Sequence, residues 1–261
     1  MSPGLVVGWL GWWAGLVTRS RAVAYASEYF DSGVFLADLS RRVAFRTESG
    51  IAGRRPDLLA YLEQEMVPVA HRLGAAAWIT DNPVAGGGPL LIARRDEDPG
   101  LLTVLTYGHA DVVLAEPERW RAGLDPWRVT VEQDRWYGRG TADNKGQHTI
   151  NLAALHSVLR ARSGRLGFNL ALLVETSEET GSPGLREFCA RHSDEWAADV
   201  LIASDGPRVA AGPSVAVRRL QSVCAVALSG TELGSGTAVA GGPGWCGLIL
   251  SSAGRGGGLA W

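Results

Sequence analysis

Three short apolar segments, each followed by an acid or a histidine, constrain the fold of this chain most strongly. Residues 101–107 read Leu-Leu-Thr-Val-Leu-Thr-Tyr, and residues 168–174 and 200–203 have the same apolar character. Segments that are apolar without alternation are typical of strands buried on both faces of a sheet. In α/β sheets, functional side chains collect at the carboxyl ends of such strands. The pattern therefore predicts an α/β protein whose polar clusters converge at one edge of a sheet.

Four other segments carry apolar residues at helical spacing, and short strand-like segments lie between them. The predicted helices are 35–43, 56–73, 145–162 and 185–192, and the further predicted strands are 76–80, 89–93, 128–131 and 136–137. We expect Asp31 and Ser32 to cap the first helix, because these residue types accept hydrogen bonds from free backbone N–H groups. We also expect Pro68 to kink the second helix.

The composition is that of an ordinary globular protein, with 46% apolar and 20% charged residues. Its 261 residues suit one large α/β domain or two small ones. The net charge of −2 gives no sign of the basic surface that binds nucleic acids, so we expect no nucleic-acid partner. Cys189, Cys224 and Cys246 are too few and too irregularly spaced for a disulfide framework, which favours a cytoplasmic location.

The two ends of the chain differ from its middle. Residues 4–17 are apolar but too short to span a bilayer comfortably, and arginines follow them rather than precede them as in a signal peptide. We expect residues 1–27 to be a non-native start or a peripheral helix, with a membrane or export signal as the alternative. Residues 213–261 are glycine-rich and aperiodic, apart from a candidate strand at 223–228. We expect a truncated or frame-shifted end there, with a natural flexible tail as the alternative.

His109 and Asp111 follow the first of the three buried strands, within Gly-His-Ala-Asp-Val-Val. In an extended segment, residues two apart point to the same side. Asp111 can therefore accept the hydrogen bond from the imidazole N–H that faces away from a metal, which fixes the tautomer. Taken alone, a His-x-Asp pair is weak evidence for a site, because most such pairs lie on the surface by chance.

Four further acidic residues follow apolar or glycine-rich segments. Asp143 stands in a glycine-rich turn, where it can bridge two cations or cap the next helix. Glu178 and Glu179 are adjacent after a buried strand, where two carboxylates repel unless a cation compensates them or one is protonated. One of them can bind metal while the other takes a proton from metal-bound water, or the pair can begin a surface helix. Asp205 is a candidate ligand or an ordinary turn residue in Asp-Gly.

Other polar and aromatic residues have a structural interpretation. His148 and His156, on the helix after Asp143, are expected to be structural or solvated, and Cys189 to be a small core residue. Lys145 has no assigned chemical role. The tryptophans of the long connection, Trp120 and Trp127, are expected to pack it.

Five motifs in chain order carry a family resemblance. They are Gly-His-Ala-Asp-Val-Val, Asp-Pro-Trp, Gly-Arg-Gly-Thr-Ala-Asp-Asn-Lys-Gly, Glu-Glu-Thr-Gly-Ser and Ser-Asp-Gly-Pro. Together they resemble the two-zinc exopeptidases and deacylases that include glutamate carboxypeptidase, acetylornithine deacetylase, succinyl-diaminopimelate desuccinylase, aminoacylase and carnosine dipeptidase. The resemblance covers residues 28–212. It implies part of a catalytic domain of the zinc exopeptidase kind, a three-layer mixed sheet flanked by helices, incomplete at its C-terminus.

The resemblance also implies roles for the matched residues. His109 and Asp205 would bind one zinc, Glu179 the other, and Asp143 would bridge both. Glu178 would be the general base and Asp111 would orient the imidazole of His109. The two zinc ions would activate a water molecule for attack on an amide carbonyl of a small peptide or N-acyl amino acid.

The chain departs from the family after the last motif. Members normally place a lid and dimerisation domain there, and then supply a late histidine to the Glu179 zinc. No histidine follows His192, and residues 213–261 are too few for a lid and returning strands. Because catalytic zinc normally has three protein ligands, we expect an incomplete second site and weak hydrolytic activity.

Three interpretations of the function stay open at this stage. The first is a zinc-dependent amide hydrolase of the dipeptidase, carboxypeptidase or N-acyl-amino-acid deacylase type, impaired by truncation. The second is a catalytically inactive remnant or binding protein of the same fold. The third is an unrelated single-metal or acid–base enzyme that uses Glu178. None of the three requires a membrane partner.

Overall fold

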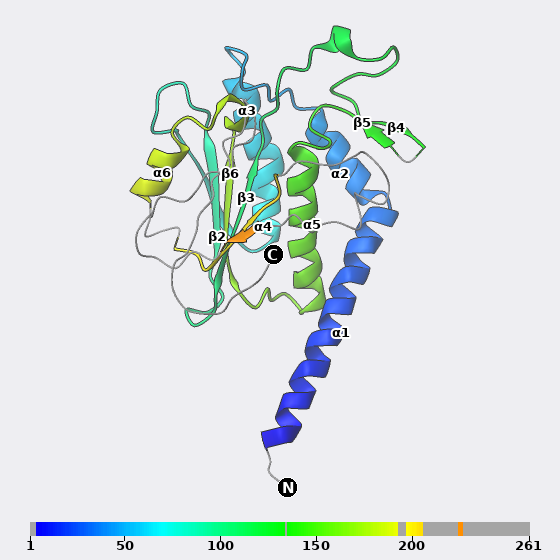
Figure 1. The fold of residues 1–261 in the computed structure, drawn as a ribbon, viewed down its shortest axis with the longest axis vertical. Helices are drawn as coiled ribbons and strands as arrows, with labels where there is room; N and C mark the ends of the chain where they lie inside the picture. The colour runs from blue at the N-terminus through cyan, green and yellow to red at the C-terminus, as the bar shows by residue number, and fades with distance from the viewer. Residues whose placement is uncertain (1–3, 134, 193–196, 206–223, 227–261) are drawn as a thin grey trace.

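The structure, a computed structural model, describes residues 4–133, 135–192, 197–205 and 224–226, with the backbone alone at 4–17 and 224–226. Figure 1 shows a central sheet with long helices on one face and α6 (Leu185–Arg191) on the other. This is the three-layer α/β architecture that the sequence predicts. Strand β8 (Cys224–Val226) lies within the expected strand 223–228. The other expectations for residues 213–261 fall outside the described residues.

The main sheet contains six described strands in the order β1-β2-β6-β3-β7-β8. Their bounds are β1 Ala76–Thr80, β2 Leu90–Arg95, β3 Thr103–His109, β6 Asn169–Glu175, β7 Val200–Ala203 and β8 Cys224–Val226. Strand β3 is parallel to both β6 and β7, and the remaining pairs are antiparallel. The three strands that the sequence marks as buried are therefore adjacent, and their carboxyl ends lie at one edge of the sheet.

Strand β3 ends later than predicted. The sequence places His109 just beyond the strand, whereas the structure pairs His109 with Glu175 as the last rung of the β3–β6 ladder. The parallel ladder continues through Gly108, where a Cβ atom would lie 3.2 Å from atoms of Asn144 and His148. The missing side chain lets the start of α5 approach the strand, so that His109 stays in extended backbone beside it.

The helices and the small hairpin surround this sheet. Their bounds are α1 Gly4–Asp31, α2 Val34–Val43, α3 Arg55–Tyr61, η1 Leu62–Met66, α4 Val67–Arg72, η2 Pro117–Arg119, β4 Thr130–Glu132, β5 Arg135–Tyr137, α5 Lys145–Ala161 and η3 Glu178–Thr180. The expected N-terminal extension falls within α1, whose C-terminal half packs beside α5 (Figure 1). Among the helices that the structure describes, none combines the length and the hydropathy needed to cross a membrane.

The predicted cap of the helix at 35–43 is wrong. Asp31 is the last residue of α1, and Gly33 occupies the N-cap position of α2 without a side-chain hydrogen bond. The backbone of Gly33 is left-handed, with φ of 82°. The chain bends between the two helices (Figure 1), and glycine adopts this left-handed conformation without steric cost.

The predicted irregularity near Pro68 takes a different form. A π-helical turn, η1, ends two residues before Pro68, and Pro68 stands in the first turn of α4. Proline cannot donate a hydrogen bond to the carbonyl four residues earlier, and the wider turn accommodates that missing donor. The helix then ends at Gly74, where φ is 71°, as the sequence predicts.

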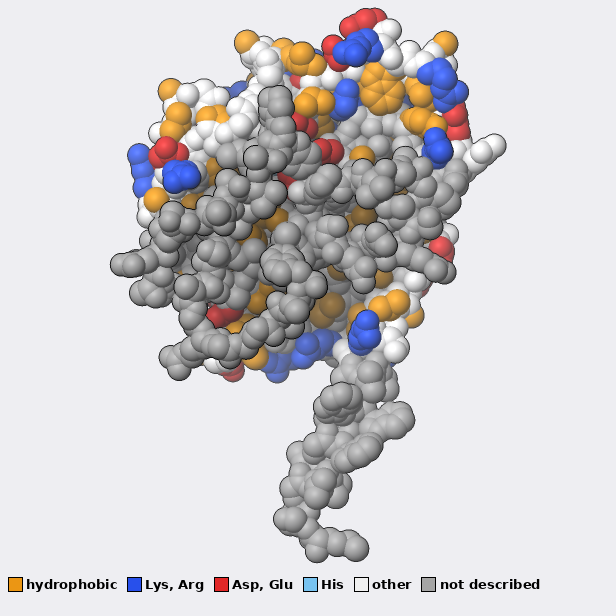
Figure 2. Space-filling view, in the orientation of Figure 1, with side chains coloured by type: hydrophobic (Ala, Val, Ile, Leu, Met, Phe, Trp, Pro, Cys, Tyr) orange, Lys and Arg blue, Asp and Glu red, His pale blue; other side chains and the backbone are white. Residues whose placement is uncertain are grey.

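The core lies on both faces of strand β6, whose seven residues are all buried. Leu170, Leu172 and Val174 pack under the helices of one layer, while Ala171 and Leu173 pack under α6 and its neighbours. This burial confirms the prediction of a buried strand at 168–174, whereas β3, predicted to be buried on both faces, leaves Thr103, Val104 and Tyr107 partly exposed. On the face drawn in Figure 2, basic and acidic side chains are interspersed over the coloured surface.

Candidate metal centre

The carboxyl edge of the three parallel strands carries the predicted site residues. His109 ends β3, Glu178 and Glu179 form the short turn η3 after β6, and Asp205 stands two residues beyond β7. Asp143 comes from the glycine-rich turn before α5. Because β3 lies between β6 and β7, the histidine is central and acidic residues approach it from both sides.

The imidazole of His109 lies close to four carboxylates. Its Nε2 atom is 3.0 Å from Asp143 Oδ1, 3.8 Å from Glu178 Oε2 and 3.8 Å from Asp205 Oδ2. Its Nδ1 atom is 3.3 Å from Asp111 Oδ1. The two ring nitrogens thus face different partners, as a metal-ligating histidine with a separate orienting carboxylate requires.

Two overlapping groups have the spacing of metal ligands. His109, Glu178 and Asp205 form one group, and His109, Asp143 and Glu179 form the other, with the candidate ligand atoms in each within 4.8 Å of one another. All six residues singled out from the sequence therefore meet in one place. The family resemblance places Asp143 with Glu179 and His109 with Asp205, and both pairs recur in these groups.

Asp111 is the buried anchor of the site, with no exposed surface. Its carboxylate accepts hydrogen bonds from Ser49 Oγ at 2.6 Å, from the backbone N–H of Glu178 at 3.2 Å and from that of Glu179 at 3.1 Å. One carboxylate thus holds the start of η3 and faces the imidazole of His109. Charge-assisted hydrogen bonds of this kind are stronger than neutral ones and fix the geometry of their partners.

The electrostatics of the cluster favour a cation. Burial raises the pKa of Glu178 to about 7, and the Asp205 carboxylate adds to the shift while His109 opposes it. Burial likewise raises the pKa of Glu179 to about 7, with a further contribution from Asp143. The pKa of His109 is raised well above its usual value, because Asp111 and Asp143 outweigh the opposing effect of burial. Carboxylates crowded around one imidazole repel one another unless positive charge compensates them.

The donor set suits a divalent cation. One imidazole and several carboxylate oxygens are ligands that Zn²⁺ accepts, and the mixture also suits related transition metals. His109 is fully buried, Glu178 and Asp205 are largely buried, and Asp143 is half exposed. The residues present therefore fit a metal centre that opens to solvent on the Asp143 side.

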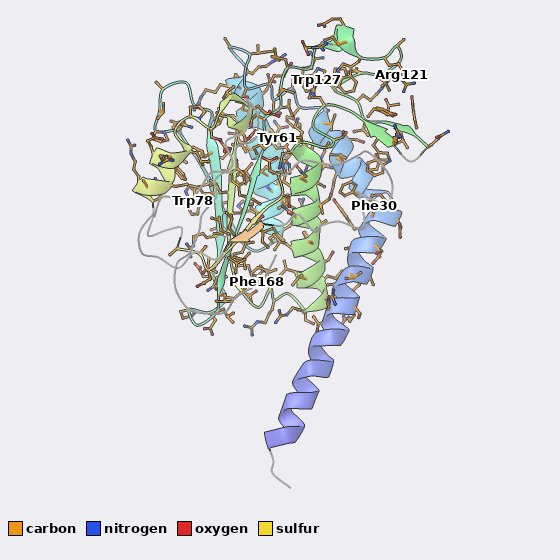
Figure 3. All side chains as sticks on the ribbon, in the orientation of Figure 1. Phe30, Tyr61, Trp78, Arg121, Trp127 and Phe168 are labelled. Atoms are coloured by element: carbon orange, nitrogen blue, oxygen red, sulfur yellow. The ribbon has the colours of Figure 1, made fainter. Side chains whose placement is uncertain are left out.

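Behind the cluster lies a buried support that the sequence did not reveal. The Nδ1 atom of His148 lies 3.2 Å from the carbonyl oxygen of His109, and Tyr61 Oη lies 2.6 Å from His148 Nε2. Burial holds the pKa of His148 well below its usual range, so the ring is neutral. A neutral ring satisfies both contacts if Nδ1–H donates to the carbonyl and Nε2 accepts from the tyrosine. Figure 3 shows Tyr61 between the helices and the sheet.

The sequence also did not predict the contacts that Lys145 and Ser49 make behind the cluster. Lys145 is fully buried, and its Nζ donates to the carbonyl of Phe45 at 2.7 Å and lies 5.1 Å from the centre of the Tyr61 ring. Ser49 lies between the predicted helices 35–43 and 56–73, where the sequence predicts no element. Neither position carries a spacing signal, because their partners are far away in the chain. His156, in contrast, is exposed, and Trp120 donates to the carbonyl of Ala115 in the long connection.

Comparisons with known proteins point to the same kind of enzyme family as the motifs. Residues 105–233 match the sequence profile of Peptidase family M20/M25/M40. The cysteinylglycine-S-conjugate dipeptidase of Corynebacterium striatum is 34% identical over 136 residues, which are 51% of this chain and 29% of that protein. The β-Ala-His dipeptidase of Mus musculus is 36% identical over 120 residues, 45% of this chain and 24% of that protein. This chain therefore spans less than a third of the length of either relative.

A comparison with solved structures also finds a similarity to a dipeptidase. The crystal structure of human carnosine dipeptidase 1 superimposes with a TM-score of 0.64 and 28% sequence identity. The match covers 73% of this chain and 42% of that one.

Proposed function

This chain carries a domain of Peptidase family M20/M25/M40, and on that premise we propose that it is a metal-dependent hydrolase of peptide bonds in dipeptides. The observation that supports this most directly is the His109-centred cluster at the carboxyl edge of the sheet. Dipeptides are favoured over N-acyl amino acids and longer peptides because both curated relatives above are named as dipeptidases.

The proposed cofactor is zinc, with two ions per site in the resembling family and an incomplete second site expected in this chain. His109 and Asp205 would hold one ion, Glu179 would hold the other, and Asp143 would contribute to both. Bound zinc would polarise the substrate carbonyl and lower the pKa of a bound water molecule. Asp111 keeps the His109 imidazole oriented, since its carboxylate faces Nδ1 at 3.3 Å.

Glu178 is proposed as the general base. Its carboxylate reaches the centre of the cluster, with Oε2 at 3.8 Å from His109 Nε2, and its backbone N–H is anchored on Asp111. It accepts a proton from the attacking water and returns it to the leaving amine. In the metal-free chain, burial raises the pKa of this carboxyl to about 7.

The test compares Glu178→Gln with the parent chain, both loaded with zinc, on a panel of dipeptides and N-acyl amino acids. Loss of the base should lower kcat by about 100- to 10,000-fold. Glu187→Gln, an exposed substitution of the same kind on α6, is the matched control and should leave kcat unchanged. Zinc content is measured for each variant, so that a loss of metal is not mistaken for a loss of the base.

Two outcomes would oppose the proposal. A parent chain that binds zinc fully but hydrolyses no substrate would instead support an inactive or binding protein of the same fold. Hydrolysis that survives a strong chelator would support acid–base chemistry without metal. A cytoplasmic location stays a prediction from the cysteine content.

A further inference from the structure

Residues 47–49 run beside the loop that carries Asp111. The backbone N–H of Val112 donates to the carbonyl of Thr47 at 2.9 Å, and Thr47 Oγ1 donates to the carbonyl of Ala110 at 2.7 Å. Glu48 forms a parallel bridge with Val112. Thr47, Ala110 and Val112 are fully buried, so these bonds are shielded from water. The two segments therefore form one rigid unit.

The side chain of Glu48 adds a second attachment to the same loop. Its Oε1 atom accepts the backbone N–H of Ala115 at 2.8 Å, and its Oε2 atom lies 3.4 Å from an Arg54 guanidinium nitrogen. The segment is thus held on both sides of Asp111 by contacts that do not involve Asp111 itself. A side chain that projects from this unit has a defined position before any metal binds.

Ser49 projects from this unit and donates its hydroxyl to Asp111 Oδ2 at 2.6 Å. The same oxygen accepts the backbone N–H of Glu179, while Oδ1 accepts that of Glu178 and faces His109 Nδ1. The hydroxyl therefore sets the plane of the carboxylate, and the plane decides whether Oδ1 points at the imidazole. Without it, only the two backbone N–H groups of η3 hold the carboxylate, which is then oriented less firmly toward the imidazole.

We infer that Ser49 is a positioning residue of the metal centre and acts through the carboxylate of Asp111. The inference rests on the proposed function in one respect only, that the His109-centred cluster binds a divalent cation. Residues that orient the ligands of a metal typically contribute 10- to 100-fold to its affinity, about the effect expected here. Ser49 does not reach the ligand atoms themselves, so its removal should change how well the metal is held rather than which residues hold it.

The experiment measures the zinc affinity of the full chain by competition with a chromophoric chelator. Ser49→Ala should weaken zinc binding by about tenfold or more. Ser49→Thr and Ser49→Val have nearly the same shape and differ in one hydroxyl, so the threonine variant should bind at least about tenfold more tightly than the valine variant. Ser157→Ala is the matched control, since Ser157 is buried in α5 and donates to the carbonyl of Ala153. It should bind zinc like the parent.

Two further measurements separate this role from a loss of structure. Cobalt loaded in place of zinc should show an altered visible spectrum in Ser49→Ala and Ser49→Val, and the parent spectrum in Ser49→Thr. In an Asp111→Asn background, Ser49→Ala should weaken zinc binding by less than about twofold further, because the two residues act in series. The Thr and Val variants keep the test decisive even if the alanine variant does not fold.

The results that would overturn the inference are distinct from those that oppose the proposed function. If the parent binds zinc and both Ser49→Ala and Ser49→Val bind it within twofold of the parent, Ser49 has no positioning role. An additional tenfold loss in the Asp111→Asn background would also overturn it, because Ser49 would then act by another route. If the parent binds no zinc, the metal centre itself is refuted together with this inference.

Discussion

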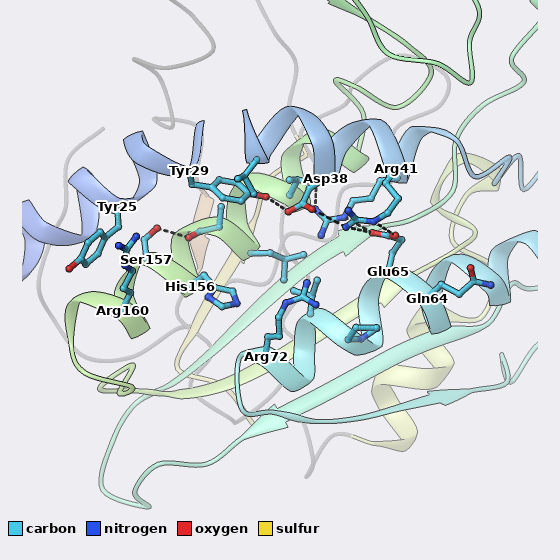
Figure 4. Close-up of a pocket in the computed structure, with 17 residues that line it drawn as sticks. Tyr25, Tyr29, Asp38, Arg41, Gln64, Glu65, Arg72, His156, Ser157 and Arg160 are labelled. Carbon is cyan, nitrogen blue, oxygen red and sulfur yellow. Dashed lines mark hydrogen bonds and ion pairs between the residues drawn. The ribbon is translucent and has the colours of Figure 1, made fainter. Parts of the chain in front are cut away.

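Glu65 in the π-helical turn η1 is the centre of a buried ion-pair network, and its removal should destabilise the fold strongly. Figure 4 shows this network along a cleft of about 580 Å³ between α1, α2, α4 and α5. Arg41 reaches Glu65 with its Nε at 2.6 Å and a terminal nitrogen at 3.0 Å. Arg42 Nε lies 3.5 Å from Glu65 Oε2. A terminal nitrogen of Arg42 donates a hydrogen bond to the hydroxyl of Thr149 in α5 at 2.5 Å.

The expected loss in the free energy of unfolding depends on how deeply the two arginines are buried. Arg42 and Glu65 are 2% and 4% exposed, whereas Arg41 is 50% exposed. Removing one partner of a buried pair leaves an uncompensated charge and costs about 3–5 kcal/mol. An exposed pair contributes about 1 kcal/mol or less. Glu65→Gln should therefore lower the free energy of unfolding by about 3–5 kcal/mol, a large part of the roughly 5–15 kcal/mol of a typical domain.

Urea unfolding of the zinc-free chain, followed by far-UV circular dichroism at neutral pH, measures this effect. Glu63→Gln, on the exposed side of the same turn, is the matched control and should change the free energy by less than about 0.5 kcal/mol. Arg41→Gln should cost about 1 kcal/mol or less. The reasoning is refuted if Glu65→Gln costs no more than Glu63→Gln, or if Arg41→Gln costs as much as Glu65→Gln.

Three further predictions concern the glycine-rich turn, the pH dependence of stability and the metal. Gly146→Ala should abolish tight zinc binding, measured by chelator competition, because a Cβ atom there would lie 2.0 Å from the backbone oxygen of Thr141 and displace the turn that carries Asp143. Glu97→Gln should destabilise the chain at pH 7, and this loss should shrink as the pH falls below the ordinary carboxyl pKa, because the backbone N–H groups of Leu166 and Gly167 and a neighbouring arginine overcome burial and lower the pKa of Glu97. Zinc at 100 times its dissociation constant should raise the free energy of unfolding by about 2.7 kcal/mol, and a chelator should reverse this gain.

Each of these three has an observation that would contradict it. Gly50→Ala is the control for the turn, since its Cβ atom would meet only Leu114 at 3.8 Å; equal zinc binding by Gly146→Ala and Gly50→Ala would refute the steric reasoning. A lowered pKa means that the contribution of Glu97 is present above the ordinary carboxyl pKa and is lost as the pH falls. A difference between parent and Glu97→Gln that grows on acidification would show that the shift has the opposite sign. Zinc that leaves the unfolding free energy unchanged would show that no site in the folded chain prefers it.

Local sequence patterns predicted which segments form the central sheet and which residues lie at the carboxyl edge of its parallel strands. Strands β1 and β7 have the predicted bounds, and β6 shows the predicted burial on both faces. This was possible because apolar character, helical spacing and turn residues act locally along the chain. The convergence of His109 with the acidic residues followed from one general rule, that parallel strands place their carboxyl ends together. The roles of these residues came from the resemblance of the motifs.

The side chains that support this edge could be identified only from the packing of the folded chain. Ser49 and Asp111 are 62 positions apart, and Tyr61 and His148 are 87 apart. No periodicity relates such pairs, because their contact depends on how separate elements pack rather than on the residues beside them. The left-handed turn at Gly33 arises in the same way, from the bend between α1 and α2. The local sequence pattern therefore identified the candidate ligands. Long-range packing brings the residues behind them into place, which are Ser49, His148 and Lys145.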